Sequence, residues 1–371
     1  MTALPAPECG EPITTAEKTC PEGRGYGSDL TKIRNGCGRT PGSGRPDLPP
    51  QIKLEEIVKT SALRFLRCPE CQGLFGLEPH SMEDHEVMEG TLTCEECLKS
   101  YPVVRGIPRF VSSGDYAESF GYEWHRFREV QLDSRNGTHQ SEQALYATTG
   151  WEESDYRERL VLDAGVGSGR FAEIVANKGG EVVGVDVTGA VDAAFENIGR
   201  NDRVHLIQAD IFSMPFATGT FDLAYSVGVL HHTPDPRAAF EKVADTVKPG
   251  GGLAVYLYHR YGPGHRGSDT VRKLTTRLPV NVMLALSTVA IPLYYLYRIP
   301  LLGKVLRLAL PISMHPDGQW RWLDTFDWYT PHYQWKFLYP EIDRWFKSNG
   351  FVDIELFDDP IRMRGIKTGQ A

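Results

Sequence analysis

The pattern of apolar and polar positions changes along the chain. Residues 1–50 are rich in glycine, proline, serine and charge and have almost no apolar periodicity. Such a segment cannot bury enough surface to order itself, which predicts a disordered tail. Further along, short apolar runs alternate with segments of helical periodicity, which predicts a parallel sheet with helices on both faces. The predicted strands are 160–164, 182–187, 204–209, 221–226, 252–258 and, late in the chain, 351–357.

Two of the predicted helices carry clear start or stop signals. Asp235 supplies an N-cap acceptor and Pro236 a first-turn proline, so a helix should begin there. Pro249–Gly250 should stop this helix. A second helix is predicted over Glu341–Asn349, with Gly350 as its C-terminal cap.

A glycine-rich turn follows the first predicted strand. Gly165, Gly167 and Gly169 alternate there, and helical periodicity begins directly afterwards. Glycine is needed where the backbone turns tightly or approaches a ligand more closely than a Cβ would allow. A dinucleotide fingerprint would need G-x-G-x-x-G, but Arg170 occupies the position of its third glycine. Asp186 ends the next apolar run, where an acid can bind ribose hydroxyls.

These motifs resemble those of class I S-adenosylmethionine (SAM) dependent methyltransferases, of the methyltransferase type 11 or ubiquinone-methyltransferase-like kind. The segments that match in order and spacing are Leu162–Arg170, Val185–Asp186, Gln208–Ile211, Phe221–Ser226, Leu230–His232 and Lys248–Gly251. The resemblance implies an α/β fold with a doubly wound, Rossmann-like sheet, and SAM as the cofactor.

The resemblance also implies which residues bind the cofactor. The methionine part of SAM is expected at Asp163 and the turn Gly165–Gly169, and the ribose at Asp186. The adenine is expected at Asp210 and Ile211, and Ser226 is expected near the transferring methyl group. The residues themselves leave alternatives open, because Asp210 could instead cap a turn or helix and Ser226 could make a strand-end hydrogen bond.

Two C-x-x-C pairs precede this region. Cys68 and Cys71 are separated from Cys94 and Cys97 by twenty-two residues. Four thiolates brought to one point complete a tetrahedral structural zinc site, whereas a redox role would need only one pair. His80 and His85 are alternative ligands that a four-cysteine site does not need. The segment resembles the small zinc-ribbon proteins that partner tRNA and translation-factor methyltransferases, and ribbons fused ahead of other methyltransferases.

The other three cysteines lie in the predicted tail. Cys9, Cys20 and Cys37 have irregular spacing, which favours incidental thiols over a second metal site. The paired motifs suggest metal binding in a reducing compartment rather than a disulfide framework. Residues 1–50 contain no apolar run like that of a signal peptide, so a cytoplasmic location is expected.

An apolar, basic stretch interrupts the predicted core at about 261–335. Leu278–Tyr297 contains no charged residue in twenty positions, a length that allows a membrane span. Polar residues and a proline within it, and its place inside a domain, argue against a span. Seven Lys or Arg and one acid lie between Arg266 and Leu308, a local charge of +6 in a protein of net charge −8. We expect a helical cap beside the active site, a surface that contacts the inner face of the membrane, or both.

The acceptor side of the site is less defined in the sequence. An amphipathic helix is predicted over 115–127, and its aromatic stripe of Phe120, Trp124 and Phe127 either covers the cofactor or packs in the core. The aromatic, polar segment Thr325–Gln334 is the best candidate for acceptor contacts. A hydroxyl acceptor would need a base. The histidines that could serve are His231, His232, His259 and His332, so the catalytic residues stay unassigned.

These observations together predict a domain order and a function. The expected parts are a disordered tail (1–52), a zinc ribbon (53–112), a methyltransferase core (113–260), a helical cap insertion (261–335) and the end of the core (336–371). The leading hypothesis is methyl transfer from SAM to a small molecule, glycan or lipid-linked acceptor. RNA methylation through the ribbon is less favoured, because the net charge of −8 argues against broad nucleic-acid affinity. A non-catalytic adaptor that binds SAM or a partner is the other alternative.

Overall fold

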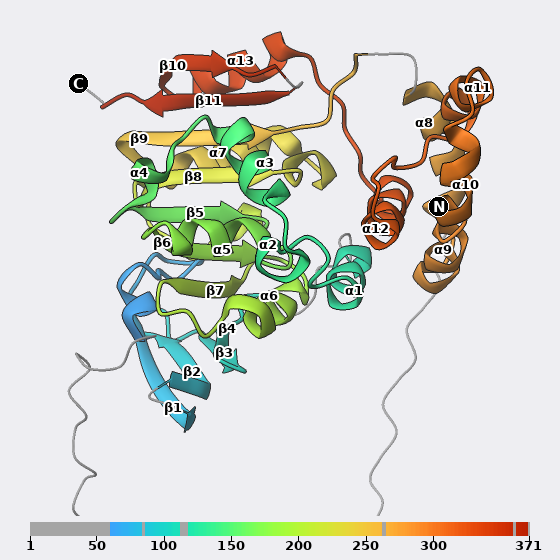
Figure 1. Cartoon of the computed structure of the whole chain (residues 1–371). Helices are drawn as coiled ribbons and strands as arrows, with labels where there is room; N and C mark the ends of the chain where they lie inside the picture. Colours follow the sequence, from blue (N-terminus) through green and yellow to red (C-terminus); the bar gives the residue numbers. More distant parts are fainter. Residues whose placement is uncertain (1–59, 84–85, 112–117, 262–264, 359–360, 370–371) are drawn as a thin grey trace, which may run out of the picture. The chain divides into compact units, whose positions relative to one another are not determined.

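The computed structural model (Figure 1) describes residues 60–369 with gaps at 84–85, 112–117, 262–264 and 359–360. Residues 53–371 form one compact unit. The predicted tail, with Cys9, Cys20 and Cys37, lies outside the described residues.

A seven-stranded sheet forms the core, in the order β10-β11-β9-β8-β5-β6-β7. The strands β5 to β9 are parallel, whereas β11 runs antiparallel to both β9 and β10. Chain order reverses at β5, which lies between β6 and β8, and such a reversal places a ligand site beyond the carboxyl ends of the strands. The strands are β5 (Leu160–Ala164), β6 (Glu181–Asp186), β7 (Val204–Gln208), β8 (Phe221–Val227), β9 (Val247–Tyr256), β10 (Phe351–Leu356) and β11 (Arg362–Lys367).

Both faces of this sheet are buried by helices. Val161 and Val182 belong to one apolar cluster and their neighbours Leu162 and Val183 to another, because successive side chains of a strand point to opposite faces. The helices outside the insertion are α1 (Glu118–Arg126), α2 (Asp133–Asn136), α3 (Gln140–Thr149), α4 (Glu153–Tyr156), α5 (Arg170–Asn177), α6 (Ala190–Ile198), α7 (Pro236–Asp245) and α13 (Tyr339–Ser348). The predicted doubly wound α/β fold is confirmed.

One predicted helix end is wrong, and one strand of the seven-stranded sheet was not predicted. Asp235 caps α7 as expected, since its carboxylate accepts hydrogen bonds from the N–H groups of Arg237 and Ala238, both at 3.1 Å. However, α7 ends at Asp245, and Pro249–Gly250 lies inside β9, where the pairing with β8 shifts register. β11 was missed because its sequence, RMRGIK, has few apolar residues and no apolar alternation, although none of its positions is fully exposed.

Five helices are inserted between β9 and α13. They are α8 (His265–Thr275), α9 (Val280–Ser287), α10 (Ala290–Tyr297), α11 (Leu302–Ala309) and α12 (Gly318–Tyr329). α12 contacts α8, α9 and α10 on one side and α1 on the other, as Figure 1 shows. The stretch Val280–Tyr297 is long and apolar enough to cross a membrane by length and composition alone, yet only 22% of it is buried.

The N-terminal ribbon is a four-stranded antiparallel sheet of its own. Its strands are β1 (Phe75–Glu83), β2 (Glu86–Cys94), β3 (Ser100–Val104) and β4 (Ile107–Pro108), after a short 3₁₀ turn at Thr60–Arg64. The ribbon lies along the β7 edge of the large sheet, where an isolated bridge joins Arg109 to Gln208 and the Phe110 N–H donates to the Gln208 carbonyl at 2.8 Å. An edge strand that is covered in this way no longer offers free backbone groups to another chain.

An arginine fork fastens the ribbon to α6. The Arg109 guanidinium donates to both carboxylate oxygens of Asp192, at 2.7 and 3.2 Å, and to the side-chain oxygen of Gln208 at 2.8 Å. Arg105 also contacts Asp192, at 2.6 Å, but its side chain is 57% exposed, against 14% for Arg109. A shielded, bidentate ion pair with a further hydrogen bond contributes more to stability than an exposed ion pair does.

We therefore expect Arg109→Ala to lower the free energy of unfolding by about 2–3 kcal/mol, because it leaves the Asp192 carboxylate poorly compensated in a buried place. Arg105→Ala is the matched control at the same acid, and it should cost less than about 1 kcal/mol. Urea unfolding of both variants measures the difference. Equal losses in the two variants would contradict the assignment of the fork as the main attachment.

Candidate functional site

A cavity of about 350 Å³ opens beyond the carboxyl ends of the parallel strands. Its lining includes the residues that directly follow β5, β6, β7 and β8, namely Gly165, Val187, Ala209 and Gly228. The opposite wall comes from α1 and from one face of α12. This is the ligand position expected of a doubly wound sheet.

The glycine turn borders this cavity because side chains would not fit there. Gly165 has φ +101°, and a Cβ on it would collide with the Val229 side chain. Gly167 has φ +52°, and its Cβ would lie 3.0 Å from the Trp124 ring. Only glycine adopts such backbone angles without strain and leaves the turn open to a ligand.

Asp186 is held at the end of β6 by the same turn. One carboxylate oxygen accepts the Gly167 N–H at 3.2 Å, and the other accepts the N–H and hydroxyl of Thr188 at 2.9 and 2.8 Å. Burial raises the pKa of Asp186, and these hydrogen bonds act against that rise. The carboxylate therefore has a fixed position on the cavity wall.

Four of the eight predicted cofactor-binding residues line the cavity, namely Gly165, Gly167, Asp186 and Ile211. The other four lie just behind it. The Asp163 carboxylate accepts the Tyr225 hydroxyl at 3.0 Å, and burial raises the pKa of Asp163 to about 7. Gly169 is the N-cap of α5.

Asp210 and Ser226 make the local hydrogen bonds that the sequence left open as alternatives. The Asp210 carboxylate accepts the Phe212 N–H at 3.0 Å and so caps a 3₁₀ turn. Ser226 is fully buried, and its hydroxyl donates to the Ala164 carbonyl at 2.8 Å. The cavity wall next to Ser226 is formed instead by Val227, Gly228 and Val229.

The wall opposite the turn is carboxyl-rich, which the sequence did not predict. One face of α12 supplies Trp320, Leu323, Asp324, Asp327 and Trp328, spaced as neighbours on a helix surface. The predicted acceptor segment Thr325–Gln334 thus contributes only its first turn. The sequence signal for this wall was the pair Asp324 and Asp327, which are three residues apart in a stretch with few other acids.

The aromatic helix α1 both lines the cavity and packs in the core. Trp124 and Glu123 line the cavity, whereas Phe127 is buried and its ring lies 5.0 Å from that of Trp322. The side chain of Phe120 is outside the described ones. One carboxylate oxygen of Glu123 is buried and has no hydrogen-bond partner among the described residues.

Burial raises the pKa of all three carboxyls on this wall. Glu123 is 1% exposed, and the charges of Asp327 and Asp324 raise its pKa further. Burial, then the Asp324 charge, raises the pKa of Asp327 to about 7, and the Tyr258 hydroxyl donates to its carboxylate at 3.3 Å. The Arg170 guanidinium acts in the opposite direction on each of them.

Of the four histidines considered as bases, only His232 lines the cavity. Its Nδ1 donates to the Tyr333 carbonyl at 2.8 Å, and burial lowers the pKa of His232 to about 4. His231 is fully buried beside it, with its ring 3.9 Å from that of Tyr258. His259 and His332 are not part of the lining.

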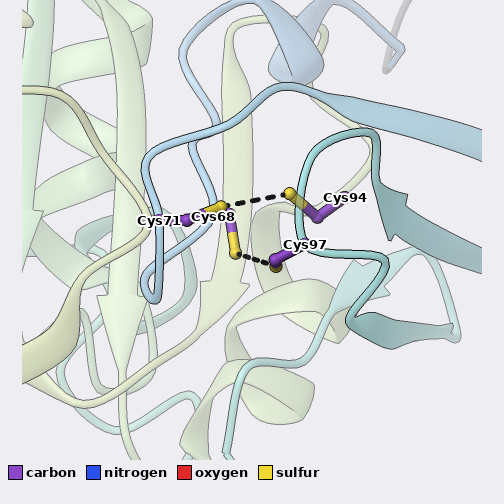
Figure 2. A group of neighbouring side chains, drawn as sticks. All are labelled: Cys68, Cys71, Cys94 and Cys97. Atoms are coloured by element: carbon purple, nitrogen blue, oxygen red, sulfur yellow. Dashed lines mark hydrogen bonds between the residues drawn. The ribbon is translucent and has the colours of Figure 1, made fainter.

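The four predicted cysteine ligands meet at one point in the ribbon (Figure 2). The sulfurs of Cys68, Cys71, Cys94 and Cys97 all lie within 4.8 Å of one another. Cys68 and Cys97 sulfurs are 3.6 Å apart, and those of Cys71 and Cys94 are 3.4 Å apart. Four sulfurs bound about 2.3 Å from one zinc ion stand about 3.8 Å apart, so this set fits tetrahedral zinc.

The donor chemistry agrees with a metal site. Backbone N–H groups of Cys97 and Glu96 lower the pKa of Cys94 to about 7. In Cys71 and Cys97 the N–H groups of Gly73 and Lys99 favour the thiolate, but burial and the neighbouring thiols outweigh them and raise the pKa. Cys94 therefore becomes the thiolate, the form that binds zinc, more readily than these two. His80 is not part of the cluster, and His85 is outside the described residues.

Comparison with known families supports both the assignment of the cavity region and that of the cysteine cluster. Residues 162–255 match the family described as methyltransferase domain, and residues 60–106 match the Trm112p-like protein family. The chain carries a SAM-dependent methyltransferase domain and a Trm112-like zinc ribbon. Its cofactors are SAM and a structural zinc ion. The open glycine turn, the fixed Asp186 carboxylate and the cavity beside them fit SAM, and the four thiols fit zinc.

Individual curated relatives match about a quarter of this chain. A sterol 24-C-methyltransferase of Gibberella zeae is 33% identical over 26% of this chain and 27% of its own length. A tRNA U34 carboxymethyltransferase of Klebsiella pneumoniae is 34% identical over 28% of this chain and 32% of its own. The chain spans between about a quarter and a half of the curated relatives that it matches.

Among solved structures, a complex of the Haloferax volcanii Trm112 methyltransferase activator with a methyltransferase is similar. The match covers 68% of this chain and 99% of that chain, at 14% identity and a TM-score of 0.41.

We expect Cys94→Ser to abolish zinc binding, because an alcohol does not replace the thiolate that the Cys97 and Glu96 N–H groups favour. Zinc released from purified protein can be measured with a chromogenic chelator. The matched control replaces Cys9, Cys20 and Cys37 with serine together and should retain the full zinc content. Loss of zinc in that control would show that the metal is held by different thiols.

Proposed function

We propose that this protein transfers a methyl group from SAM to a hydroxyl or amino group of a small-molecule, glycan or lipid-linked acceptor. One observation carries the proposal: a single cavity joins the glycine turn and Asp186 to the carboxyl-lined face of α12. Cofactor and acceptor can therefore meet in one place.

On the cofactor side, the turn Gly165–Gly169 would hold the methionine part of SAM. Asp186, with both oxygens oriented by Gly167 and Thr188, would take the ribose hydroxyls, and Ile211 would pack against the adenine. Asp163, Asp210 and Ser226 would act through these neighbours by fixing the ends of the strands. SAM supplies a methyl group on a sulfonium, an activated leaving group, so the protein mainly has to align and desolvate the reactants.

On the acceptor side, Asp327 is the group that we assign to take the acceptor's proton. It faces the cavity, and its hydrogen bond from Tyr258 orients it. A base works best when its pKa lies near the working pH, and burial brings that of Asp327 to about 7. In His232 the Nδ1–H donates to the Tyr333 carbonyl, which leaves Nε2 as the basic atom. His232 is nevertheless less suited, because burial lowers its pKa to about 4.

RNA methylation is the second candidate, and the Trm112-like ribbon and the similarity to a tRNA-modifying enzyme favour it. The carboxyl-rich wall argues against it, because nucleic-acid sites are lined with Lys and Arg and these carboxyls offer no positive charge to phosphates. A non-catalytic adaptor would not need a cavity that joins a cofactor turn to a candidate base.

The acceptor class can be tested with radiolabelled SAM, purified protein and extract of the host. After separation, we expect label in the lipid, glycan or small-molecule fraction, because the carboxyl-rich wall suits an uncharged or cationic acceptor. Asp327→Asn protein should leave those fractions unlabelled. Label confined to RNA would overturn this proposal and make the ribbon the substrate-recognition module.

Asp186→Ala should weaken SAM binding by about 100-fold, the loss expected when two hydrogen bonds to a charged group disappear. Calorimetric titration measures the affinity, and circular dichroism confirms that the variant is folded. Asp210→Ala is the informative comparison. A small change there supports a capping role, whereas a loss as large as that of Asp186→Ala would mean that Asp210 contacts the cofactor.

The transfer rate should rise with pH and level off above about 7, because the Asp327 carboxylate must be ionised to accept a proton. The groups that face it are Glu123, Asp324, Tyr258, Arg170 and Arg272. Asp327→Asn should remove the pH-dependent limb and most of the activity. Asp343→Asn, on the exposed surface of α13, should keep the wild-type profile. An unchanged profile in Asp327→Asn would exclude Asp327 as the base.

A further inference from the structure

The inserted helices expose an unusual amount of apolar surface. Of the twenty exposed large apolar side chains in the described part of the chain, thirteen lie between Leu274 and Leu310. They are Leu274, Val282, Leu286, Val289, Ile291, Tyr295, Leu296, Ile299, Leu301, Leu302, Val305, Leu308 and Leu310. Isolated exposed apolar residues are ordinary, but a concentration of exposed apolar side chains in one segment of the chain marks an interaction surface. We call this set the apolar face.

Only a narrow side of each helix is packed. α9 buries Met283 and Ser287, α10 buries Ala290 and Tyr297, and α11 buries Gly303. The packed side of α9 lies against α12, where Trp322 donates to the Leu284 carbonyl and the Ser287 hydroxyl, and α10 also contacts α12. The rest of the helices therefore lies open.

The charge around the apolar face has one sign. Lys273, Arg277, Arg298, Lys304 and Arg307 are exposed there. The sequence has no acid between Asp269 and Asp317. None of the five cations has a carboxylate partner among the residues that the structure describes. Apolar side chains edged with cations are complementary to an anionic bilayer surface.

We propose that α9, α10 and α11 lie on an anionic membrane and insert the apolar face between its lipids. The helices lie in the surface rather than cross it. The strands before and after the insertion, β9 and β11, are hydrogen-bonded partners in one sheet, so both ends of the insertion stay on the same side. A single span would separate them.

This docking also points to a lipid-linked acceptor, an inference that rests on the proposed function. α12 packs against α9 and α10 with one side and lines the cavity with Asp324, Asp327 and Trp328 on another. Arg321, which is 3% exposed, donates to the carbonyl of Ile291 and fixes the two parts together. A bilayer under the apolar face would hold the head group of a lipid-linked acceptor near the α12 wall.

Vesicle co-sedimentation of the full-length protein tests the docking. Vesicles of phosphatidylcholine alone are compared with vesicles that also contain phosphatidylglycerol, and we expect binding to the anionic vesicles that weakens with added salt. Val305→Ser combined with Leu308→Ser should reduce the binding by about tenfold or more. Val352→Ser with Leu356→Ser is the matched control, since these residues are similarly exposed but lie on β10.

Equal binding by both double variants, or no preference for anionic vesicles, would overturn the proposal. A second copy of this chain is the rival occupant. If wild-type protein sediments as a dimer that Val305→Ser/Leu308→Ser dissociates, the apolar face is a self-association surface and the proposal is wrong.

SAM titration on the same preparations separates the two claims. Lost vesicle binding with intact SAM binding is expected of the Val305→Ser/Leu308→Ser variant, and its methyl transfer to a lipid-linked acceptor in vesicles should fall with the vesicle binding. Wild-type protein that binds vesicles but transfers no label would contradict the proposed function and leave the docking intact.

Discussion

The hydrogen bond between the Gly167 N–H and the Asp186 carboxylate joins the two elements on which the site depends. It ties the turn after β5 to the end of β6, at the point where the strand order reverses. The turn stays open only because glycines hold its positive φ angles, and the acid stays oriented only because the turn and Thr188 donate to it. The cavity and the cofactor fit follow from that pair.

α12 is the element that distinguishes this site from the general features of the fold. The parallel sheet and its glycine turn are general to the fold, and fold alone does not define a substrate. In this chain the wall opposite the turn comes from an insertion, so the same helix presents carboxyls to the cavity and packs against the apolar helices outside. The wall that we propose for the acceptor and the surface that packs against the apolar helices therefore belong to one helix.

Local patterns were enough to predict the strands β5 to β10, the α7 cap, the glycine turn and the four-cysteine cluster, because each depends on residues close in sequence or on fixed chemistry. Local patterns failed where contacts between elements far apart in the sequence determine the structure. Pro249–Gly250 looks like a helix stop but is absorbed into β9 by a register shift. Glu123 and Asp327 are far apart in sequence, and only packing of α12 on α1 brings them to one wall. The hydrogen bonds of Asp210 and Ser226 needed the folded strand ends.

The central claim is that cofactor and acceptor share the cavity between the glycine turn and α12. A crystal structure with S-adenosylhomocysteine, the demethylated product of SAM, would test it most directly. The account predicts ribose hydroxyls on Asp186 and a sulfur atom that faces Asp327 across the cavity. A nucleoside bound elsewhere, or a sulfur atom directed away from α12, would contradict the account.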